Sequence, residues 1–278
     1  MNLELEHGGH RWRVALQRGV DLSIPLGAGA DMPEFFIGGT MTAETLRAGD
    51  FHADTREGGS CNVTRFELTP HCHGTHTEGI GHITHERAAV QTTVDSRPCV
   101  ALLATVTPEP AERSDDEYHC ALEPGEPLIS AAELERAVAG AVARQPVDVP
   151  FDALVLRARP LQRPLPVRDY NQDPYYPLLS VAAMRWLSEQ PIRHLLIEMP
   201  SLDRAEDGGR LGNHRLFWGL PAGFDEVEAA DPGRSITEMV RVPDELEDGL
   251  HWLEPGLSPL QSDATPSRPM LYPLEFAS

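Results

Sequence analysis

Three largely apolar runs mark the middle of this 278-residue chain, at 100–106, 153–158 and 194–199. Each run has the length of a strand and is rich in aliphatic residues. Uninterrupted apolar runs of this kind are typical of strands that are covered on both faces of a sheet. We therefore predict that these three runs form the central strands of the fold.

Two helices are predicted between these strands. Ser130 followed by Glu133 makes a capping box at the start of 131–145, where leucine and valine recur at helical spacing along one face. Ser180 can cap a second helix over 181–190, which leads directly into the third apolar run. Strand and helix thus alternate in the middle of the chain.

Two further segments, 63–70 and 236–243, alternate between polar and apolar residues with a period of two. This pattern indicates half-exposed or antiparallel strands. Together with the apolar runs it predicts an α/β or α+β fold, a mixed β-sheet flanked by helices. Because no internal repeat or linker is visible, we expect one domain over residues 1–278.

The composition is that of an ordinary globular protein and argues against several functions. A formal net charge of −20 opposes binding to phosphate backbones and to anionic membranes, so we expect neither nucleic acid nor a membrane as a partner. The N-terminal segment lacks the pattern of a signal peptide, and the four cysteines form no C-x-x-C pair. We therefore expect a cytoplasmic protein with reduced thiols.

One short segment, 71–85, concentrates residues that can bind a metal ion. Imidazole and carboxylate donors suit Zn²⁺ and neighbouring divalent metals, and a site without a cysteine quartet is more often catalytic than structural. The alternative is a polar surface loop that happens to contain many histidines. The potential ligands in this segment are His71, His73, His76, Glu78, His82 and His85.

The spacing within this segment indicates how some of these ligands could converge. His76 and Glu78 are two residues apart, so their side chains lie on the same side of an extended backbone. His82 follows Glu78 by four residues and would face the same centre if the chain coils there. Pro70 precedes the cluster, which places it at the end of the predicted strand 63–70.

Two residues far downstream are further candidates. Glu238 shares one face of the predicted strand 236–243 with apolar residues, so its carboxylate needs a cation, either a metal ion or an arginine. His214 lies in a predicted loop after a glycine-rich turn. On its own, a histidine in a loop is more often exposed than a ligand.

The sequence resembles the cyclase superfamily, which includes bacterial kynurenine formamidase and isatin hydrolase. The family signature is H-x-G-T-H-x-D-x-P-x-H. Here the G-T-H motif ends at His76, Glu78 stands in place of the aspartate, and His82 matches the final histidine. His214 and Glu238 match the downstream histidine and the distal glutamate of the family.

The resemblance extends beyond this signature. Residues 21–26 are similar to the early D-[IL]-S-x-P-L strand of the family, and residues 194–204 to its V-D-x-P-S-x-D segment. Two positions depart from the signature. Ile80 replaces the proline, and Cys72 falls where the first histidine is expected, so His71, Cys72 or His73 could be the first ligand; His71 is favoured because it follows Pro70.

The resemblance implies a swivelling β/β/α fold and a metal-dependent hydrolase of an amide or of a cyclic amide or ester, similar to arylformamidase. It implies a divalent metal, Zn²⁺ or Mn²⁺, a small-molecule substrate and a homo-oligomer, in which the proline-rich stretch 159–166 could pack between subunits. His82 would be a ligand or the general base. The predicted metal ligands are His71, His76, Glu78, His82, His214 and Glu238. Two alternatives are a degenerate protein that binds metal without turnover and a dehydrating cyclase.

Overall fold

The computed structural model describes residues 2–28, 32–160, 169–221 and 231–277. Most of its strands form one mixed sheet in the order β1-β2-β18-β16-β9-β12-β14-β15-β8-β17, with β3 beside β18. Within these described ranges no helix is long and apolar enough to cross a membrane. The proline-rich stretch 159–166 lies mostly outside the described residues.

The predicted central strands are confirmed. Four strands run parallel at the centre of the sheet, in the order β9, β12, β14 and β15, and almost every residue of theirs is buried. Their bounds are β9 (Cys99–Val106), β12 (Ala153–Ala158), β14 (His194–Ile197) and β15 (Ser235–Glu238). Leucine, isoleucine and valine on both faces of these strands fill the hydrophobic core.

Antiparallel strands extend both sides of this parallel centre. Beyond β15, the sheet continues through β8 (His76–Glu78) to β17 (Ala264–Pro266). On the other side lie four antiparallel strands and the short β3: β16 (Gly249–Glu254), β18 (Met270–Phe276), β2 (His10–Ala15), β1 (Asn2–His7) and β3 (Val20–Asp21). The sheet is therefore mixed, as the sequence predicts.

The segment 236–243 forms a shorter and more buried strand than its alternating pattern suggests. β15 ends at Glu238, and Met239 takes a left-handed backbone with a φ of 55°. All four residues of β15 are buried, because β14 and β8 flank the strand and other elements cover both of its faces. Of the two expectations for this segment, half-exposed or antiparallel, the first is wrong. The second holds on one side only, because β15 is antiparallel to β8 and parallel to β14.

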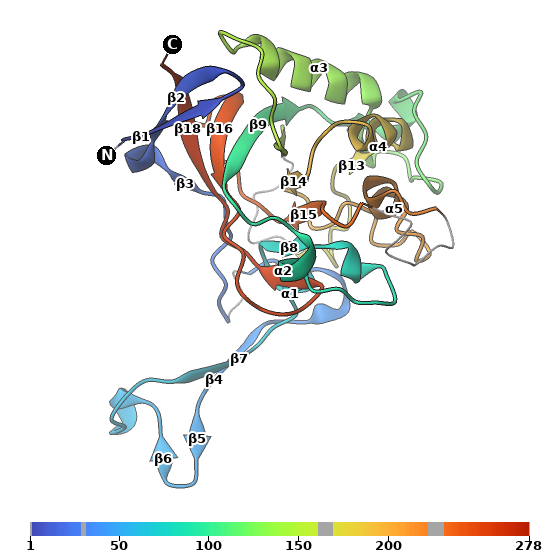
Figure 1. The fold of residues 1–278 in the computed structure, drawn as a ribbon. Coiled ribbons are helices and arrows are strands. Elements are labelled where there is room, and N and C mark those ends of the chain that lie inside the picture. The colour runs from blue at the N-terminus through green and yellow to red at the C-terminus, as the bar shows by residue number, and fades with distance from the viewer. Residues whose placement is uncertain (1, 29–31, 161–168, 222–230, 278) are drawn as a thin grey trace.

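Three helices gather on one side of the sheet (Figure 1). They are α3 (Ala131–Ala143), α4 (Val181–Ser188) and α5 (Gly212–Trp218). Ser130 and Ser180 cap the first two as predicted, since each hydroxyl oxygen accepts a bond from a backbone N–H. The capping box at Ser130 is only half formed, because the Glu133 carboxylate accepts the Thr107 N–H instead.

Residues 42–67 form an arm that projects away from the body of the protein (Figure 1). In the arm β4 (Thr42–Thr45) pairs with β7 (Thr64–Glu67), and β5 (Arg47–Ala48) pairs with β6 (Phe51–His52). The predicted strand 63–70 is therefore antiparallel but fully exposed. It ends at Glu67, and Pro70 begins the short helix α1 (Pro70–His73).

The remaining elements are short. A small sheet joins β10 (Glu109–Pro110), β11 (Pro127–Ile129) and β13 (Leu178–Leu179). One further short helix is α2 (Val90–Thr93). Five 3-10 turns complete the described elements: Leu16–Arg18, Phe36–Gly38, Thr55–Glu57, Ile80–His82 and Ala111–Arg113.

Candidate metal centre

The histidine-rich segment folds as a helix, a strand and a turn that face one centre. His71 lies on α1, His76 and Glu78 lie on β8, and His82 ends the 3-10 turn Ile80–His82. The extended backbone between His76 and Glu78 and the coil that brings back His82 are both as predicted. His71 instead lies on a helix, which corrects the expectation of a strand end.

Glu238 and His214 reach the same centre from distant parts of the chain. In the pairing of β15 with β8, Glu238 is the direct partner of His76, and His76 Nε2 lies 3.3 Å from Glu238 Oε2. His214 Nε2 lies 2.8 Å from Glu78 Oε1 and 3.6 Å from Glu238 Oε1. His214 is 1% exposed and lies on α5, so its placement in a loop is wrong.

The four imidazoles share one arrangement. In each ring one nitrogen faces Glu78 or Glu238, and the other faces an acceptor outside the centre. The outer acceptors are Asp263 for His71 and His82, the backbone oxygen of Gly74 for His76, and Asp203 for His214. An outer partner of this kind fixes the ring orientation of metal-binding histidines.

Two buried atoms of the centre have no hydrogen-bond partner among the residues that the structure describes. His76 Nε2 and Glu78 Oε2 are close to Glu238 and His71, at 3.3 Å and 3.0 Å, but neither pair has the alignment of a hydrogen bond. Buried polar atoms are rarely left without a partner. The donor types and these two atoms fit a divalent cation that would be held between the imidazoles and the carboxylates.

The centre strongly perturbs the pKa values of its groups. Burial opposes the charged form of His71, but the carboxylates of Asp263 and Glu78 outweigh it and raise its pKa to about 10. Burial likewise opposes the charge of Glu78, yet the neighbouring His82 and His214 hold the pKa of Glu78 well below its usual value. Without a cation, the carboxylates and imidazoles therefore stabilise each other as opposite charges.

A cavity of about 310 Å³ opens onto this centre. His71, Glu78, His82, His214 and Glu238 all line it. Two aromatic residues form another part of the wall: Phe35 and Phe36. Phe36 has a left-handed backbone with a φ of 56° and is 51% exposed. A small molecule in this cavity would therefore contact both the polar centre and aromatic rings.

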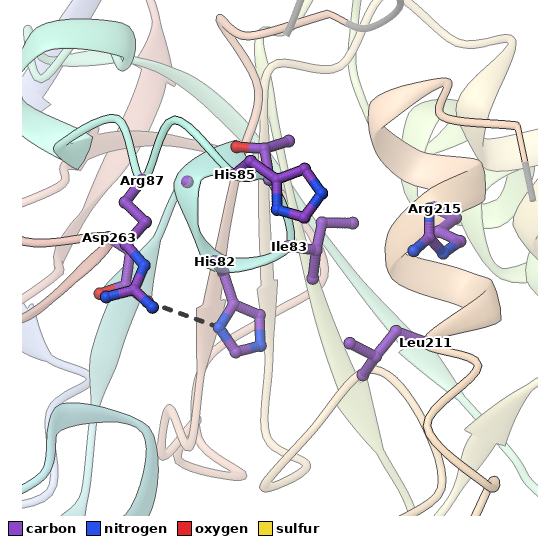
Figure 2. Close-up of a pocket in the computed structure, with 9 residues that line it drawn as sticks. His82, Ile83, His85, Arg87, Leu211, Arg215 and Asp263 are labelled. Atoms are coloured by element: carbon purple, nitrogen blue, oxygen red, sulfur yellow. Dashed lines mark ion pairs between the residues drawn. The ribbon is translucent and has the colours of Figure 1, made fainter. Parts of the chain in front are cut away.

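A second cavity of about 590 Å³ lies beside the first, and His82 and Leu211 line both. Figure 2 shows His82 beside Asp263 and Arg87, with Arg215 of α5 on the opposite side. His82 is therefore positioned between the two cavities. Its side chain is 26% exposed, far more than the side chains of His76 or His214.

Three other residues of the segment lie outside this set of donors. His73 bonds to the Thr69 N–H and the Gly39 oxygen at the base of the arm, and His85 lines the larger cavity. Cys72 lines the smaller cavity, but among the described residues it belongs to no group of converging metal donors. Of the three candidates for the first ligand, His71 is the one whose ring enters the centre.

The sequence prediction missed four residues that shape the site: Phe35, Phe36, Asp203 and Asp263. Asp203 lies within the segment 194–204 that carries part of the family resemblance, so a signal for it existed. Asp263 lies in a loop before β17 without any recognisable motif, and only the pairing of β17 with β8 brings it to His82.

The comparisons with known proteins agree with this fold. A family model named Cyclase, with the description "Putative cyclase", matches residues 20–204. None of the curated proteins that were compared matches this sequence. Among solved structures, a potential metal-dependent hydrolase with cyclase activity aligns with a TM-score of 0.57 and 16% identity, over 92% of this protein and 98% of its own length.

Two more solved structures are similar. A predicted metal-dependent hydrolase from Bacillus stearothermophilus aligns with a TM-score of 0.55 and 16% identity, over 91% of this protein and 97% of its own length. Isatin hydrolase A from Labrenzia aggregata, bound to benzyl benzoate, aligns with a TM-score of 0.56 and 16% identity, over 92% of this protein and 93% of its own length. At this identity the likeness establishes a shared fold.

Proposed function

Because the chain belongs to the cyclase family, we propose that it is a metal-dependent hydrolase that cleaves the C–N bond of an amide, or opens a cyclic amide or ester. The observation that carries this proposal is the convergence of four imidazoles and two carboxylates on one centre, where three of the imidazoles and both carboxylates line a single cavity. The hydrolases among the solved structures with this fold support it.

The residues that would hold the metal are His71, His76, Glu78, His214 and Glu238, and His82 lies beside them. Imidazole and carboxylate donors suit Zn²⁺ and Mn²⁺. When bound, such an ion supplies Lewis acidity, which polarises a carbonyl group and lowers the pKa of water from 15.7 toward about 7. Each of the four imidazoles contacts an acceptor outside the centre through one ring nitrogen, which keeps its other nitrogen directed toward Glu78 or Glu238.

His82 is the residue that we assign to proton transfer. Its Nε2 is 3.8 Å from Glu78 Oε2, the longest of the contacts to Glu78, and its side chain is partly exposed to both cavities. An imidazole in this place can accept a proton from the attacking water and deliver it to the leaving nitrogen as the C–N bond breaks. The products are then a carboxylic acid and an amine.

The aromatic wall of the smaller cavity supports an aryl substrate, as in an arylformamidase-like reaction. Phe36 is half exposed beside the centre, and Phe35 packs edge-to-face with Tyr170 and Tyr176. Rings prefer such offset or edge-on contacts with other rings. A ring-bearing amide would lie against Phe36 with its carbonyl group toward Glu78 and His82.

The proposal is tested with purified protein. Metal content is measured by elemental analysis, and hydrolysis of arylformamides, cyclic amides and lactones is measured before and after chelation. We expect activity that chelation abolishes and that added Zn²⁺ or Mn²⁺ restores. Hydrolysis that persists after complete removal of the metal would contradict the proposal.

A further inference from the structure

Asp263 is fixed beside the metal centre by its backbone and by one of its two carboxylate oxygens. The Gly79 N–H donates to the Asp263 backbone oxygen at 3.0 Å, directly after Glu78. The Ser262 hydroxyl donates to Asp263 Oδ1 at 2.8 Å. The other oxygen, Oδ2, is therefore directed at the histidines.

Asp263 Oδ2 contacts two imidazoles. His71 Nε2 lies 3.0 Å from it, and His82 Nδ1 lies 3.5 Å from it (Figure 2 draws the pair with His82). The rings of His71 and His82 are stacked, with centroids 4.2 Å apart and an angle of 29° between their planes. One carboxylate oxygen thus contacts two stacked rings.

An ionised carboxylate can only accept hydrogen bonds, so His71 Nε2 must carry hydrogen where it bonds to Asp263, and the same carboxylate 3.5 Å from His82 Nδ1 favours hydrogen on that nitrogen. In neutral rings this leaves lone pairs on His71 Nδ1 and on His82 Nε2. These two nitrogens are the ones near Glu78 Oε2, at 3.0 Å and 3.8 Å. The lone pairs are then directed into the centre, where a cation or a proton would be received.

We propose that Asp263 is a positioning residue that fixes the ring tautomers and orientations of both His71 and His82. Asp203 makes the corresponding contact with His214, at 2.7 Å from Nδ1, but it serves that one imidazole. The role of Asp263 in metal binding rests on the proposed function, whereas its contacts with the two rings can be measured without any metal or substrate.

The first arm of the test uses protein stripped of metal and labelled with ¹⁵N histidine. Hydrogen-bonded ring protons are observed by NMR and assigned with His71→Gln and His82→Gln. We expect downfield proton signals on His71 Nε2 and His82 Nδ1 that disappear in Asp263→Ala. Signals that are unchanged in Asp263→Ala would overturn the proposal.

The second arm measures Zn²⁺ affinity by competition with a coloured chelator. Loss of an outer partner typically weakens metal binding roughly 10- to 100-fold, and we expect a loss in this range for Asp263→Ala. Asp95→Asn is the matched control, since the Asp95 side chain is similarly exposed (27% against 33%) but pairs with Arg97 and Arg193. Equal affinity in Asp263→Ala and the control would also overturn the proposal.

Two further results separate this proposal from the proposed function. If Zn²⁺ does not bind to the unaltered protein while the ring signals depend on Asp263, the metal-dependent function is wrong and the assignment of Asp263 to the two rings is supported. If Asp263→Ala does not fold, both measurements are made on Asp263→Asn, which keeps the shape of the side chain without its charge. Its ring signals and affinity should then fall between those of the unaltered protein and complete loss, and unchanged values would overturn the proposal.

Discussion

His76 and Glu238 are direct partners across the antiparallel pair of β8 and β15, with His76 Nε2 3.3 Å from Glu238 Oε2. This pairing joins a strand from the first third of the chain to one from its last fifth. The buried carboxylate that the alternating pattern of 236–243 singled out thus meets imidazoles rather than an arginine. The register of β15 against β8 places the side chains of Glu238 and His76 on the same face of the sheet.

Replacing Glu238 with glutamine tests whether this pair holds a cation. Glu238→Gln removes a charged donor from the centre, so we expect Zn²⁺ affinity to fall by more than the roughly 10- to 100-fold that loss of an outer partner costs. Isothermal titration of the metal-free protein measures this change. Glu254→Gln is the control, because Glu254 bonds to Tyr272 on the other side of the sheet.

A cation in the centre should also stabilise the fold. A ligand that binds the native state alone raises the free energy of unfolding, by about 2.7 kcal/mol at a hundredfold excess over its Kd. We expect added Zn²⁺ to raise the melting temperature of the unaltered protein and of Glu254→Gln, but not of Glu238→Gln. An equal rise in all three proteins would contradict a role of Glu238 in metal binding.

The central strands and two of the helices could be predicted from the sequence because the patterns that indicate them are local. The strands β9, β12 and β14 are largely apolar, and the serines that cap α3 and α4 directly precede their helices. The arm could not be predicted in this way. Its strand β7 alternates like a half-buried strand, yet all four residues are exposed, and only the tertiary arrangement determines this.

The residues of the candidate site likewise differ in whether local sequence patterns could predict them. The convergence of candidate ligands within one segment follows from their spacing. His76 and Glu78 are two residues apart on a strand, and one turn of the chain brings His82 back to Glu78. Asp263 is different, because its contact with His82 depends on the pairing of β17 with β8 and on no local pattern. Sequence signals of period two or four carry no information on such a distant contact.

Gly81→Ala tests the tight turn that positions His82. An added Cβ would lie 2.1 Å from the Ala88 backbone oxygen, so the turn must shift. We expect a loss of about 1–3 kcal/mol in unfolding free energy, together with weaker metal binding. Chemical denaturation and metal titration measure both effects.

The matched control for this substitution is Gly140→Ala. Gly140 lies within α3, and its added Cβ would meet nothing within 4 Å. Alanine is a better helix former than glycine, so this variant should gain about 0.5–1 kcal/mol. A Gly81→Ala protein that is as stable and as active as Gly140→Ala would rule out a sterically constrained turn.

His194 predicts a pH dependence of stability that is unrelated to the metal centre. Burial, assisted by Arg193, lowers the pKa of this side chain from 6.5 to about 4. The unfolded chain therefore binds a proton at a higher pH than the folded one. The contribution of neutral His194 to the free energy of unfolding should be fully present above pH 6.5. It should be lost as the pH drops toward 4, by up to roughly 3 kcal/mol. Denaturant unfolding of the unaltered protein and of His194→Asn between pH 4 and 8 should show a difference that shrinks on acidification; a constant difference would contradict this origin.

The cysteines should differ widely in reactivity. All four are free; Cys61 is exposed, whereas burial and the nearby Asp152 raise the pKa of the Cys99 thiol to about 12. Because the thiolate is the reactive form, iodoacetamide at pH 8 should label Cys61 well before Cys99. Peptide mass spectrometry follows the order of labelling, with the denatured protein as the reference in which all four react. Equal rates at Cys61 and Cys99 in the native protein would refute the assignment.

The strand β8 lies between β15 and β17, both of which come much later in the chain. During synthesis the histidine-rich segment therefore leaves the ribosome long before its neighbours exist. Closing loops of this length is slow compared with forming local contacts. For most of its translation, the nascent polypeptide consequently carries the imidazoles of this segment without Glu238 and Asp263, the acidic residues that face them in the folded protein.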